Sequence, residues 1–382
     1  MLPDRLAGLG ISVSERARRF NVVWVPVGSE AVAESRPVMH PYCNHFAIIL
    51  QSLCNQVRLH RKRPLKILFI TATRIGDAVL SSGLVAHLAA QHPGVRFTIA
   101  CGAPAAPLFE AVPGLDRLIV IEKKSFHSHW LSLWAACIGN RWDRIYDLRG
   151  SMLARLIWAG ERHIGNYRDD SIHRVEELGR LIGVSPPPTP MLSLSDEARE
   201  AAAGLILEGL PVLAIGPTAN WGGKQWPADR FAALALRSTG AGGLLGGASV
   251  AVLGAEPERE MAQPVLDALP AERRIDLIGR SLPVAAACIE RSTLYVGNDS
   301  GLMHIAAATG TPTLGLFGPS PETRYGPWGA HCASVRTDEG FKELVLSPDF
   351  DHLSQKTLMM GLSVDKAYEA LANLYTSVKN AS

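Results

Sequence analysis

From residue 65 onward the chain alternates short apolar runs, rich in β-branched residues, with segments whose apolar residues recur at helical spacing. The apolar runs are nearly continuous, which is typical of parallel strands that helices cover on both faces. This order predicts an α/β fold built from doubly wound parallel sheets. The expected strands are residues 66–71, 95–100, 117–121, 144–147, 163–165, 212–215, 249–253, 275–278, 294–296 and 313–317.

A proline-rich segment divides this pattern into two halves. Residues 185–190 read Ser-Pro-Pro-Pro-Thr-Pro, a stiff and extended stretch that cannot continue a helix. Because the alternation restarts after it, we expect two domains, residues 66–190 and 191–362, that face each other across a cleft. A last helix within residues 363–382 is expected to cross back over the first domain.

Composition restricts the class of protein. The chain has 382 residues, of which 47% are hydrophobic and 19% charged, with a net charge of +2. These values suit a soluble protein and give no reason to expect a nucleic-acid partner. The six cysteines include no C-x-x-C pair, so neither a disulfide framework nor a zinc ribbon is indicated. A reducing compartment, the cytoplasm, fits best.

Residues 1–65 lack the periodic pattern of the remainder and carry nine Lys or Arg against four Asp or Glu. Three interpretations stay open: a disordered or loosely docked extension, a basic tether to an anionic membrane surface, and a metal site. The spacing of the candidate ligands matches no closed metal site. Those ligands are His40, Cys43, His45, Cys54 and His60.

The turn from Asn298 to Gly301 joins an expected strand to an expected helix. The free N–H groups and positive dipole of a helix start form an anion site, and Gly301 would let a ligand approach the backbone. An ordinary capped helix explains the same Asp299 and Ser300. His304, one turn into the helix, is expected to brace the loop.

A similar turn follows the first strand and contains Gly76 and Asp77. Such a turn lies at the crevice where doubly wound folds bind ligands. Gly76 permits a close approach of the backbone. Asp77 is either the N-cap of the next helix or a carboxylate base that faces the cleft.

The loop at residues 216–227 contains Lys224 but does not match the pattern of a P-loop, because Gln225 stands where Ser or Thr is required. Lys224 can still hold a diphosphate as a point charge, although a solvated surface lysine is the simpler interpretation. In the next strand–turn–helix unit, Glu256 could bind ribose hydroxyls or complement a helix dipole.

Together these motifs resemble the ADP-heptose:lipopolysaccharide heptosyltransferase family, glycosyltransferase family 9. The resemblance extends from residue 66 to the C-terminus and depends on the order and spacing of the motifs. It implies a GT-B fold, in which two Rossmann-like domains bind the acceptor and the nucleotide sugar respectively. The motifs are Arg74-Ile-Gly-Asp77, Lys224-Gln-Trp-Pro227, Gly254-Ala-Glu256 and Asp299-Ser-Gly-Leu-Met-His304, the last followed by Phe317-Gly-Pro-Ser320.

The resemblance implies an inverting transfer of a heptose, or a related sugar, that needs no metal or other cofactor. Asp77 would take the proton from the acceptor hydroxyl, and the acceptor would be a lipopolysaccharide core or another cell-surface glycan. Peripheral contact with the inner face of the cytoplasmic membrane is a further expectation. On the acceptor side we expect Arg74, Gly76 and Arg149. On the donor side we expect Thr218, Lys224, Glu256, Asp299, Ser300, Gly301 and His304.

Some features depart from the family pattern and leave the acceptor and the donor sugar open. Gly222 and Gly223 replace bulkier polar residues, and residues 147–151 lack a lysine after the glycine. A nucleotide-sugar epimerase of the same fold and a non-catalytic nucleotide-sugar-binding protein remain alternatives. An NAD-dependent dehydrogenase is disfavoured, because no G-x-G-x-x-G follows the first strand.

Overall fold

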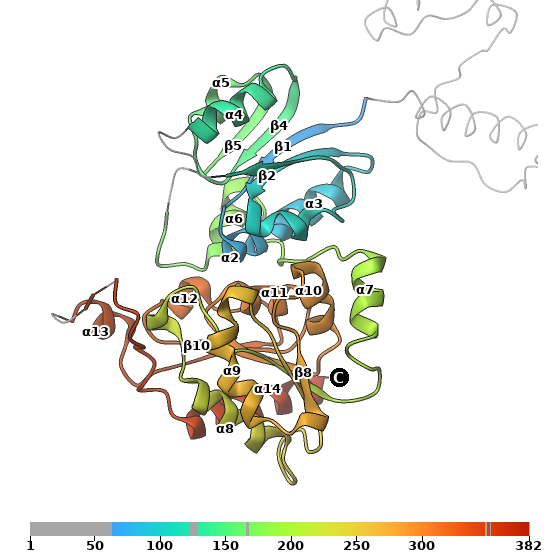
Figure 1. Ribbon diagram of the computed structural model, residues 1–382. Helices are drawn as coiled ribbons and strands as arrows, with labels where there is room; N and C mark the ends of the chain where they lie inside the picture. The colour runs from blue at the N-terminus through green and yellow to red at the C-terminus, as the bar shows by residue number, and fades with distance from the viewer. Residues whose placement is uncertain (1–62, 123–127, 166–167, 348–349, 352, 382) are drawn as a thin grey trace, which may run out of the picture. The chain divides into compact units, whose positions relative to one another are not determined.

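A computed structural model gives the structure of the protein and describes residues 63–122, 128–165, 168–347, 350–351 and 353–381 (Figure 1). Residues 1–62 form a unit separate from residues 63–382. The interpretations placed on residues 1–62, namely the metal site and the basic tether, lie outside the described residues.

The first half of residues 63–382 contains a parallel five-stranded sheet in the order β3-β2-β1-β4-β5. Ile67 to Ile70 of its central strand are fully buried, as the continuous apolar run predicts. The parallel sheet is confirmed, and the last strand is longer than expected. The strands are β1 (Lys66–Ile70), β2 (Arg96–Gly102), β3 (Leu115–Ile121), β4 (Trp142–Asp147) and β5 (Ala159–Ile164).

Two short helices, α2 and α3, follow β1, and the first of them begins before Asp77. The break falls at Ser81, whose hydroxyl donates to the Ala78 carbonyl at 2.7 Å and lies 2.7 Å from the Thr71 hydroxyl. A serine that bonds to nearby backbone competes with helix continuation. Asp77 is therefore in the first turn of a helix and is not its N-cap. The helices are α2 (Ile75–Leu80), α3 (Ser82–Gln91), the 3₁₀ helix η3 (Ala103–Phe109), α4 (Ser128–Cys137), α5 (Leu153–Leu156) and α6 (Arg174–Ile182).

The second half contains a parallel six-stranded sheet in the order β11-β10-β9-β6-β7-β8. Its outer strand β11 was not expected, because the sequence Cys-Ala-Ser-Val-Arg lacks a continuous apolar run. In the structure this strand is only partly buried. The other five strands are confirmed within a few residues. The strands are β6 (Val212–Gly216), β7 (Ser249–Val252), β8 (Arg274–Asp276), β9 (Leu294–Asn298), β10 (Thr313–Phe317) and β11 (Cys332–Arg336).

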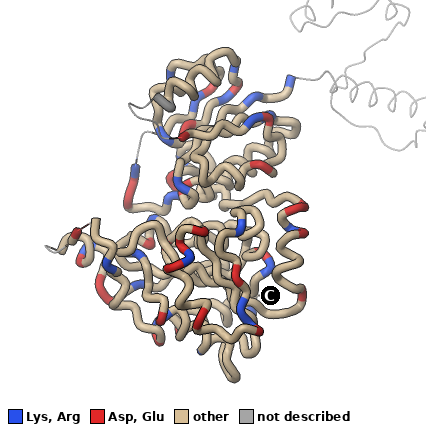
Figure 2. Tube along the Cα trace, viewed as in Figure 1, with Lys and Arg blue, Asp and Glu red and all other residues tan. Residues whose placement is uncertain are grey.

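Helices cover this second sheet as well (Figure 1 and Figure 2). Among the described helices of the chain, none is both long and apolar enough to cross a lipid bilayer. The helices are α7 (Asp196–Ala203), α8 (Ala228–Thr239), α9 (Arg259–Ala268), α10 (Leu282–Glu290), α11 (Gly301–Ala308), α12 (Glu322–Tyr325), α13 (Phe341–Val345) and α14 (Val364–Ala381), with the 3₁₀ helices η5 (Gly222–Lys224), η6 (Glu256–Glu258) and η7 (Ala271–Arg273).

The expected return of the last helix to the first sheet is wrong. In α14, Leu371 and Leu374 belong to the same core cluster as Leu213 and Leu314 of the second sheet. Each buried leucine contributes roughly 1.5–3 kcal/mol, so these contacts decide where the helix packs. Arg237 of α8 adds a cation–π contact with α14, 3.9 Å from a ring centroid.

The proline-rich segment packs closely against helices α3 and α6. A Cβ on Gly83 of α3 would lie 2.4 Å from the Thr189 carbonyl oxygen, and one on Gly179 of α6 would lie 2.6 Å from the Pro187 Cβ. Glycine is therefore required on both helices for the segment to pass. The segment joins the two sheets along a fixed path across α3 and α6.

The order of strands reverses at β1 in the first sheet and at β6 in the second. In doubly wound folds, ligands bind at such switch points, beyond the carboxyl ends of the strands. The turns that carry Asp77 and Lys224 follow β1 and β6 directly. The topology thus places both residues at expected binding edges.

Candidate functional site

Helices α2 and α11 meet at their first turns, and two glycines allow the contact. A Cβ on Gly301 would lie 2.8 Å from Ile75 Cγ2, and a Cβ on Gly76 would lie 2.8 Å from His304 Cδ2. Any larger residue at either position would force the two helix starts apart. The Ile75 side chain fills the space on the Cβ side of Gly301.

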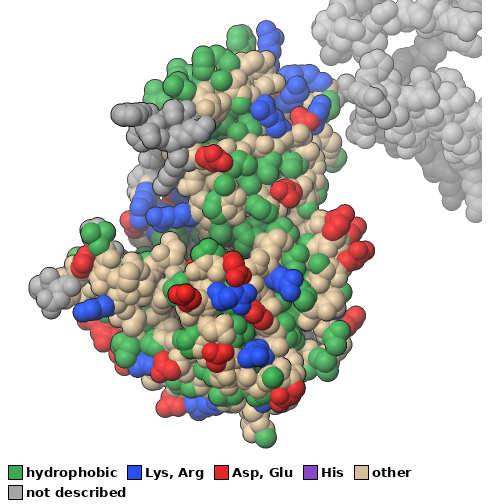
Figure 3. Space-filling view, viewed as in Figure 1, with side chains coloured by type: hydrophobic (Ala, Val, Ile, Leu, Met, Phe, Trp, Pro, Cys, Tyr) green, Lys and Arg blue, Asp and Glu red, His purple; other side chains and the backbone are tan. Residues whose placement is uncertain are grey.

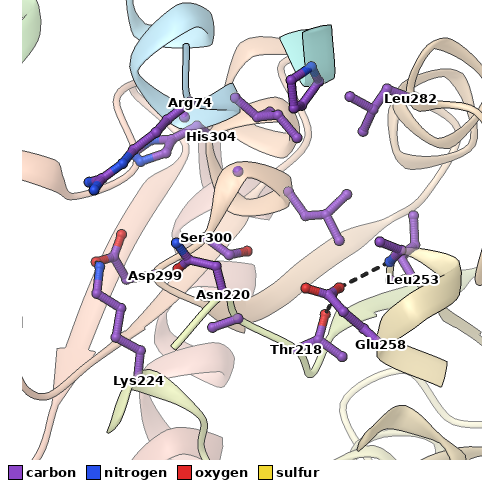
Figure 4. Close-up of a pocket in the computed structure, with 18 of the residues that line it drawn as sticks. Arg74, Thr218, Asn220, Lys224, Leu253, Glu258, Leu282, Asp299, Ser300 and His304 are labelled. Carbon is purple, nitrogen blue, oxygen red and sulfur yellow. Dashed lines mark hydrogen bonds and ion pairs between the residues drawn. The ribbon is translucent and has the colours of Figure 1, made fainter. Parts of the chain in front are cut away.

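A cavity of about 940 Å³ lies beside this contact, with walls from both sheets' loops. Its size and mixture of apolar and polar walls suit a nucleotide-sized ligand. Figure 4 shows side chains from the second half converging below the α2 turn. The expected site residues that line it are Arg74, Gly76, Asp77, Thr218, Lys224, Glu256, Asp299, Ser300, Gly301 and His304.

Lys224 and Asp299 form an ion pair in the wall of this cavity. Lys224 Nζ lies 2.5 Å from Asp299 Oδ2, and the two side chains are 26% and 7% exposed. Lys224 is thus not a freely solvated surface lysine. The pair stands directly before Ser300, the N-cap of α11, whose hydroxyl makes no capping bond.

Asn298 holds the Lys224 loop against β9. Its side-chain oxygen accepts a hydrogen bond from the Trp226 backbone N–H at 3.0 Å, and its amide donates to the Pro217 carbonyl at 2.8 Å. A buried amide that is satisfied on both sides fixes its neighbours firmly. Asn298, the last residue of β9, therefore fixes the position of the loop that carries Lys224 beside Asp299.

Thr218 does not face a ligand freely, because its hydroxyl donates to Glu258 Oε2 at 2.7 Å. The same oxygen accepts the Ala255 backbone N–H at 3.0 Å. Figure 4 shows Thr218 and Glu258 joined by a dashed line. Thr218 and Glu258 thus join the loops after β6 and β7. Sequence reasoning missed Glu258, although a Glu at the third position of a helix is a known capping signal.

Glu256 lies on the cavity wall with 63% of its side chain exposed. Its carboxylate accepts two hydrogen bonds from Arg259, at 2.9 and 3.2 Å. The hydrogen bonds from Arg259 hold the pKa of Glu256 below its usual value. An ionised, accessible carboxylate at this strand end can accept hydrogen bonds from ligand hydroxyls.

His304 is buried, at 5% exposure, between the two halves of the site. Burial lowers the pKa of His304 from 6.5 to about 4, although the charges of Asp299 and Asp77 oppose the shift. Its Nδ1 has no hydrogen-bond partner among the described residues. The imidazole is therefore neutral near pH 7. Arg74 and His304 both line the cavity, as Figure 4 shows.

We expect His304 to make the fold sensitive to acid. Its pKa in the folded state lies below the unfolded value, so the unfolded state binds the proton more tightly and stability falls as pH drops from about 6.5 toward 4. Between about pH 7 and pH 5 the wild type should lose about 2 kcal/mol more unfolding free energy than His304→Gln. Urea unfolding of both proteins at the two pH values measures this difference. Equal losses would contradict a buried neutral imidazole.

Arg149, which was expected on the acceptor side, is not among the residues that line this cavity. Its backbone N–H donates to buried Asp147 at 2.9 Å, and its guanidinium lies 4.8 Å from the Trp130 ring centroid. Burial lowers the pKa of Arg149 from its usual value. The residue belongs to the loop between β4 and α5, on the same sheet but away from the Lys224 pair.

A second connection between the halves was not predicted. Arg324 of α12 is 2% exposed, and its Nη2 donates to Glu177 of α6 at 2.7 Å. Nearby, His173 Nε2 lies 3.0 Å from the Gly326 carbonyl oxygen. Arg324 and Glu177 are 147 residues apart in the chain, so no local sequence pattern predicts their pairing. The connection ties α6 to the segment whose Tyr325 lines the cavity.

Removal of Arg324 should therefore destabilise the protein. Arg324→Met removes one of the two arginines that pair with the buried Glu177 carboxylate and leaves Arg174 as the other. Breaking a buried ion pair costs up to about 3–5 kcal/mol. The control is Arg199→Met, which removes an ion pair with Glu290 between side chains that are 48% and 30% exposed. Exposed pairs contribute about 0–1 kcal/mol. Chemical unfolding of the three proteins tests the contrast, and similar losses for both variants would contradict it.

Comparison with known proteins agrees with this architecture. The model of glycosyltransferase family 9 (heptosyltransferase) matches residues 176–348. Lipooligosaccharide heptosyltransferase 2 of Haemophilus influenzae is 26% identical over 350 residues, which cover 81% of this chain and all of the relative. Both findings support the assignment of the chain to glycosyltransferase family 9. It is accordingly a glycosyltransferase enzyme.

Solved structures show that the fold is GT-B. A family 9 glycosyltransferase from Veillonella parvula aligns with a TM-score of 0.66 at 21% identity, covering 83% of this chain and 99% of that chain. The ADP-heptose lipopolysaccharide heptosyltransferase II of E. coli aligns with a TM-score of 0.63 at 21% identity, covering 82% and 100%. The expected family and fold are confirmed.

Proposed function

We propose that this enzyme transfers a heptose from ADP-heptose to a lipopolysaccharide-core acceptor, with inversion at the anomeric carbon and without a metal. The names of the relatives support the donor and acceptor class. The observation that carries the proposal is the placement of Asp77 and the Lys224–Asp299 pair around one cavity. Since the acceptor is anchored in lipid, the reaction would take place in the cytoplasm at the inner face of the membrane.

The donor diphosphate would lie at the start of α11. There the backbone N–H groups after Ser300 and the ammonium of Lys224 supply positive charge where negative charge develops on the leaving ADP. Asp299 holds the ammonium in place at 2.5 Å. Glu256 would accept hydrogen bonds from the ribose hydroxyls. Thr218 would act indirectly, because its hydroxyl is engaged by Glu258.

Asp77 would act as the general base. It stands in the first turn of α2, in the wall that the first half contributes, whereas Lys224 belongs to the second half. Its carboxylate would take the proton of the acceptor hydroxyl while that oxygen attacks the anomeric carbon. The bond to the diphosphate breaks on the opposite face, and ADP leaves with the electron pair. Inversion follows from this single displacement.

His304 and the two glycines would set the spacing of the reaction. The His304 ring contacts Gly76, next to Asp77, and belongs to the helix whose start would hold the diphosphate. A neutral ring at this point adds no charge between base and leaving group. Correct placement of two reactants is worth several kcal/mol of the barrier. Arg74, exposed at the cavity wall, would contact the acceptor or the donor phosphates.

Nuclear magnetic resonance of the reaction product tests the stereochemistry and the metal requirement together. The protein is incubated with ADP-heptose, a lipopolysaccharide-core acceptor and excess EDTA. We expect a heptosyl product whose anomeric configuration is opposite to that of the donor. A product of retained configuration, or one that forms only when divalent metal is restored, would contradict the proposed mechanism.

A further inference from the structure

Helix α4 is apolar on both sides, although only one side packs against the core. Leu133 and Cys137 face a core cluster that also contains Leu153 of α5. On the opposite side Leu131 and Ile138 are 69% and 46% exposed. A helix that is apolar all round is normally buried on all sides. The exposed side of α4 therefore lacks a cover among the described residues.

The exposed apolar side of α4 continues across α5. Met152, Leu156 and Trp158 are 65%, 66% and 66% exposed. The Arg141 guanidinium, just after α4, lies 5.0 Å from the Trp158 ring centroid and bridges the two parts. Figure 3 shows hydrophobic side chains gathered over this end of the first half. We call the α4–α5 face the set Leu131, Trp134, Ile138, Met152, Leu156 and Trp158.

Arginines without carboxylate partners surround the α4–α5 face. Arg117 donates to the carbonyl at the end of α4 at 3.3 Å. Arg162 donates to three backbone carbonyls around α5, at 2.6 to 3.0 Å. Within the described part of the chain, neither these two nor Arg141 forms an ion pair. Their positive charges are therefore available to an anionic partner.

Carboxylates are nearly absent from the same region. Between residues 128 and 160 the sequence contains Asp143 and Asp147 as its acidic residues. Asp147 is fully buried, and Asp143 is paired with Arg63 at 2.6 Å. The face is thus apolar with an unopposed basic rim.

We propose that the α4–α5 face docks on an anionic lipid bilayer. Contiguous exposed apolar surface indicates an interaction site, and tryptophan is favoured at the membrane–water interface. Each arginine near an anionic bilayer adds electrostatic attraction. A protein partner would need a matching acidic groove, whereas a bilayer with anionic headgroups supplies apolar depth and negative charge together.

The position of the face suits an acceptor that is anchored in lipid. Met152 follows β4, whose last residue Asp147 is in register with Ile70, the last residue of β1. The turn to Asp77 begins after Ile70, at the same edge of the sheet. A bound bilayer would therefore lie toward the edge that carries Asp77. This link to catalysis rests on the proposed function, whereas docking itself does not.

Vesicle flotation tests docking without any transfer reaction. The full chain is mixed with vesicles of phosphatidylcholine and phosphatidylglycerol in equal parts, or with vesicles of phosphatidylcholine alone. We expect binding to the anionic vesicles. Leu131→Ser with Leu156→Ser should lower that binding about tenfold or more, because apolar surface no longer enters the interface. Arg141→Gln should lower it about fivefold, and only on anionic vesicles.

The matched control is Leu207→Ser with Leu210→Ser, which removes two leucines of 62% and 57% exposure in the second half. This pair should leave vesicle binding unchanged. Three results would overturn the proposal. The first is a wild type that does not float with anionic vesicles. The second is an equal loss of binding for both leucine pairs, which would assign binding to another part of the chain. The third is a dimer, detected by sedimentation, that only the α4–α5 variant dissociates, which would assign the face to a second copy.

Discussion

Asp77→Asn is expected to lower kcat about a hundredfold or more, which is the usual contribution of a positioned general base. An amide cannot accept the acceptor proton at the required step. It does keep the size of the side chain in the first turn of α2, so the contact of Gly76 with His304 should persist. The affinity for ADP should therefore be unchanged, since the diphosphate is held from the other wall.

Steady-state kinetics and calorimetric titration with ADP measure the two quantities separately. Asp229→Asn is the matched control, because Asp229 also stands in the first turn of a helix, α8, and is absent from the cavity walls. It should keep wild-type turnover. If Asp77→Asn turns over as fast as this control, Asp77 is not the base. If it loses ADP affinity as well, the residue holds the structure of the site.

Lys224→Ala is expected to weaken ADP binding by about tenfold to a hundredfold. A hydrogen bond to a charged group contributes roughly 1.5–3 kcal/mol, and the cation is lost where the diphosphate would lie. In addition, the Asp299 carboxylate, 7% exposed, loses its partner and would repel the ligand. Calorimetry with ADP measures the effect. Lys366→Ala, which breaks a surface pair with Asp338 between side chains that are 40% and 79% exposed, should have none.

A double variant separates the two causes of the Lys224 effect. Asp299→Asn removes the carboxylate that would repel the diphosphate. The double variant Lys224→Ala, Asp299→Asn should therefore bind ADP more tightly than Lys224→Ala alone, but less tightly than the wild type. Equal affinity of Lys224→Ala and the wild type would mean that Lys224 does not contact the diphosphate. Complete recovery in the double variant would mean that repulsion explains the whole loss.

The parallel sheets and the convergence of the site could be predicted from local patterns. Continuous apolar runs indicate strands buried on both faces, and the carboxyl ends of parallel strands meet at one edge. Asp77 and Lys224 each follow such a strand, so topology alone brings them to the binding edges. All of the expected site residues except Arg149 line the cavity.

The remaining features depend on contacts between distant parts of the chain. The packing of Ile75 against Gly301 and the pairing of Arg324 with Glu177 are set by how the two halves approach each other. The bond between Thr218 and Glu258 depends on two loops of the second half that are 40 residues apart. A single sequence shows the glycine but not what fills its space. The destination of α14 was mistaken for the same reason, since an apolar helix face does not say which sheet it covers.

The mass of the acceptor after reaction tests the central claim most directly. The protein is incubated with ADP-heptose and a lipopolysaccharide-core acceptor that lacks its next heptose, and the mass of the acceptor is measured by mass spectrometry. A second incubation without acceptor shows whether the donor is converted on its own. We predict that the acceptor gains the mass of one heptose while one ADP is released for each. An unchanged acceptor, together with donor that is converted in the sample without acceptor, would contradict glycosyl transfer and indicate an enzyme that acts on the nucleotide sugar alone.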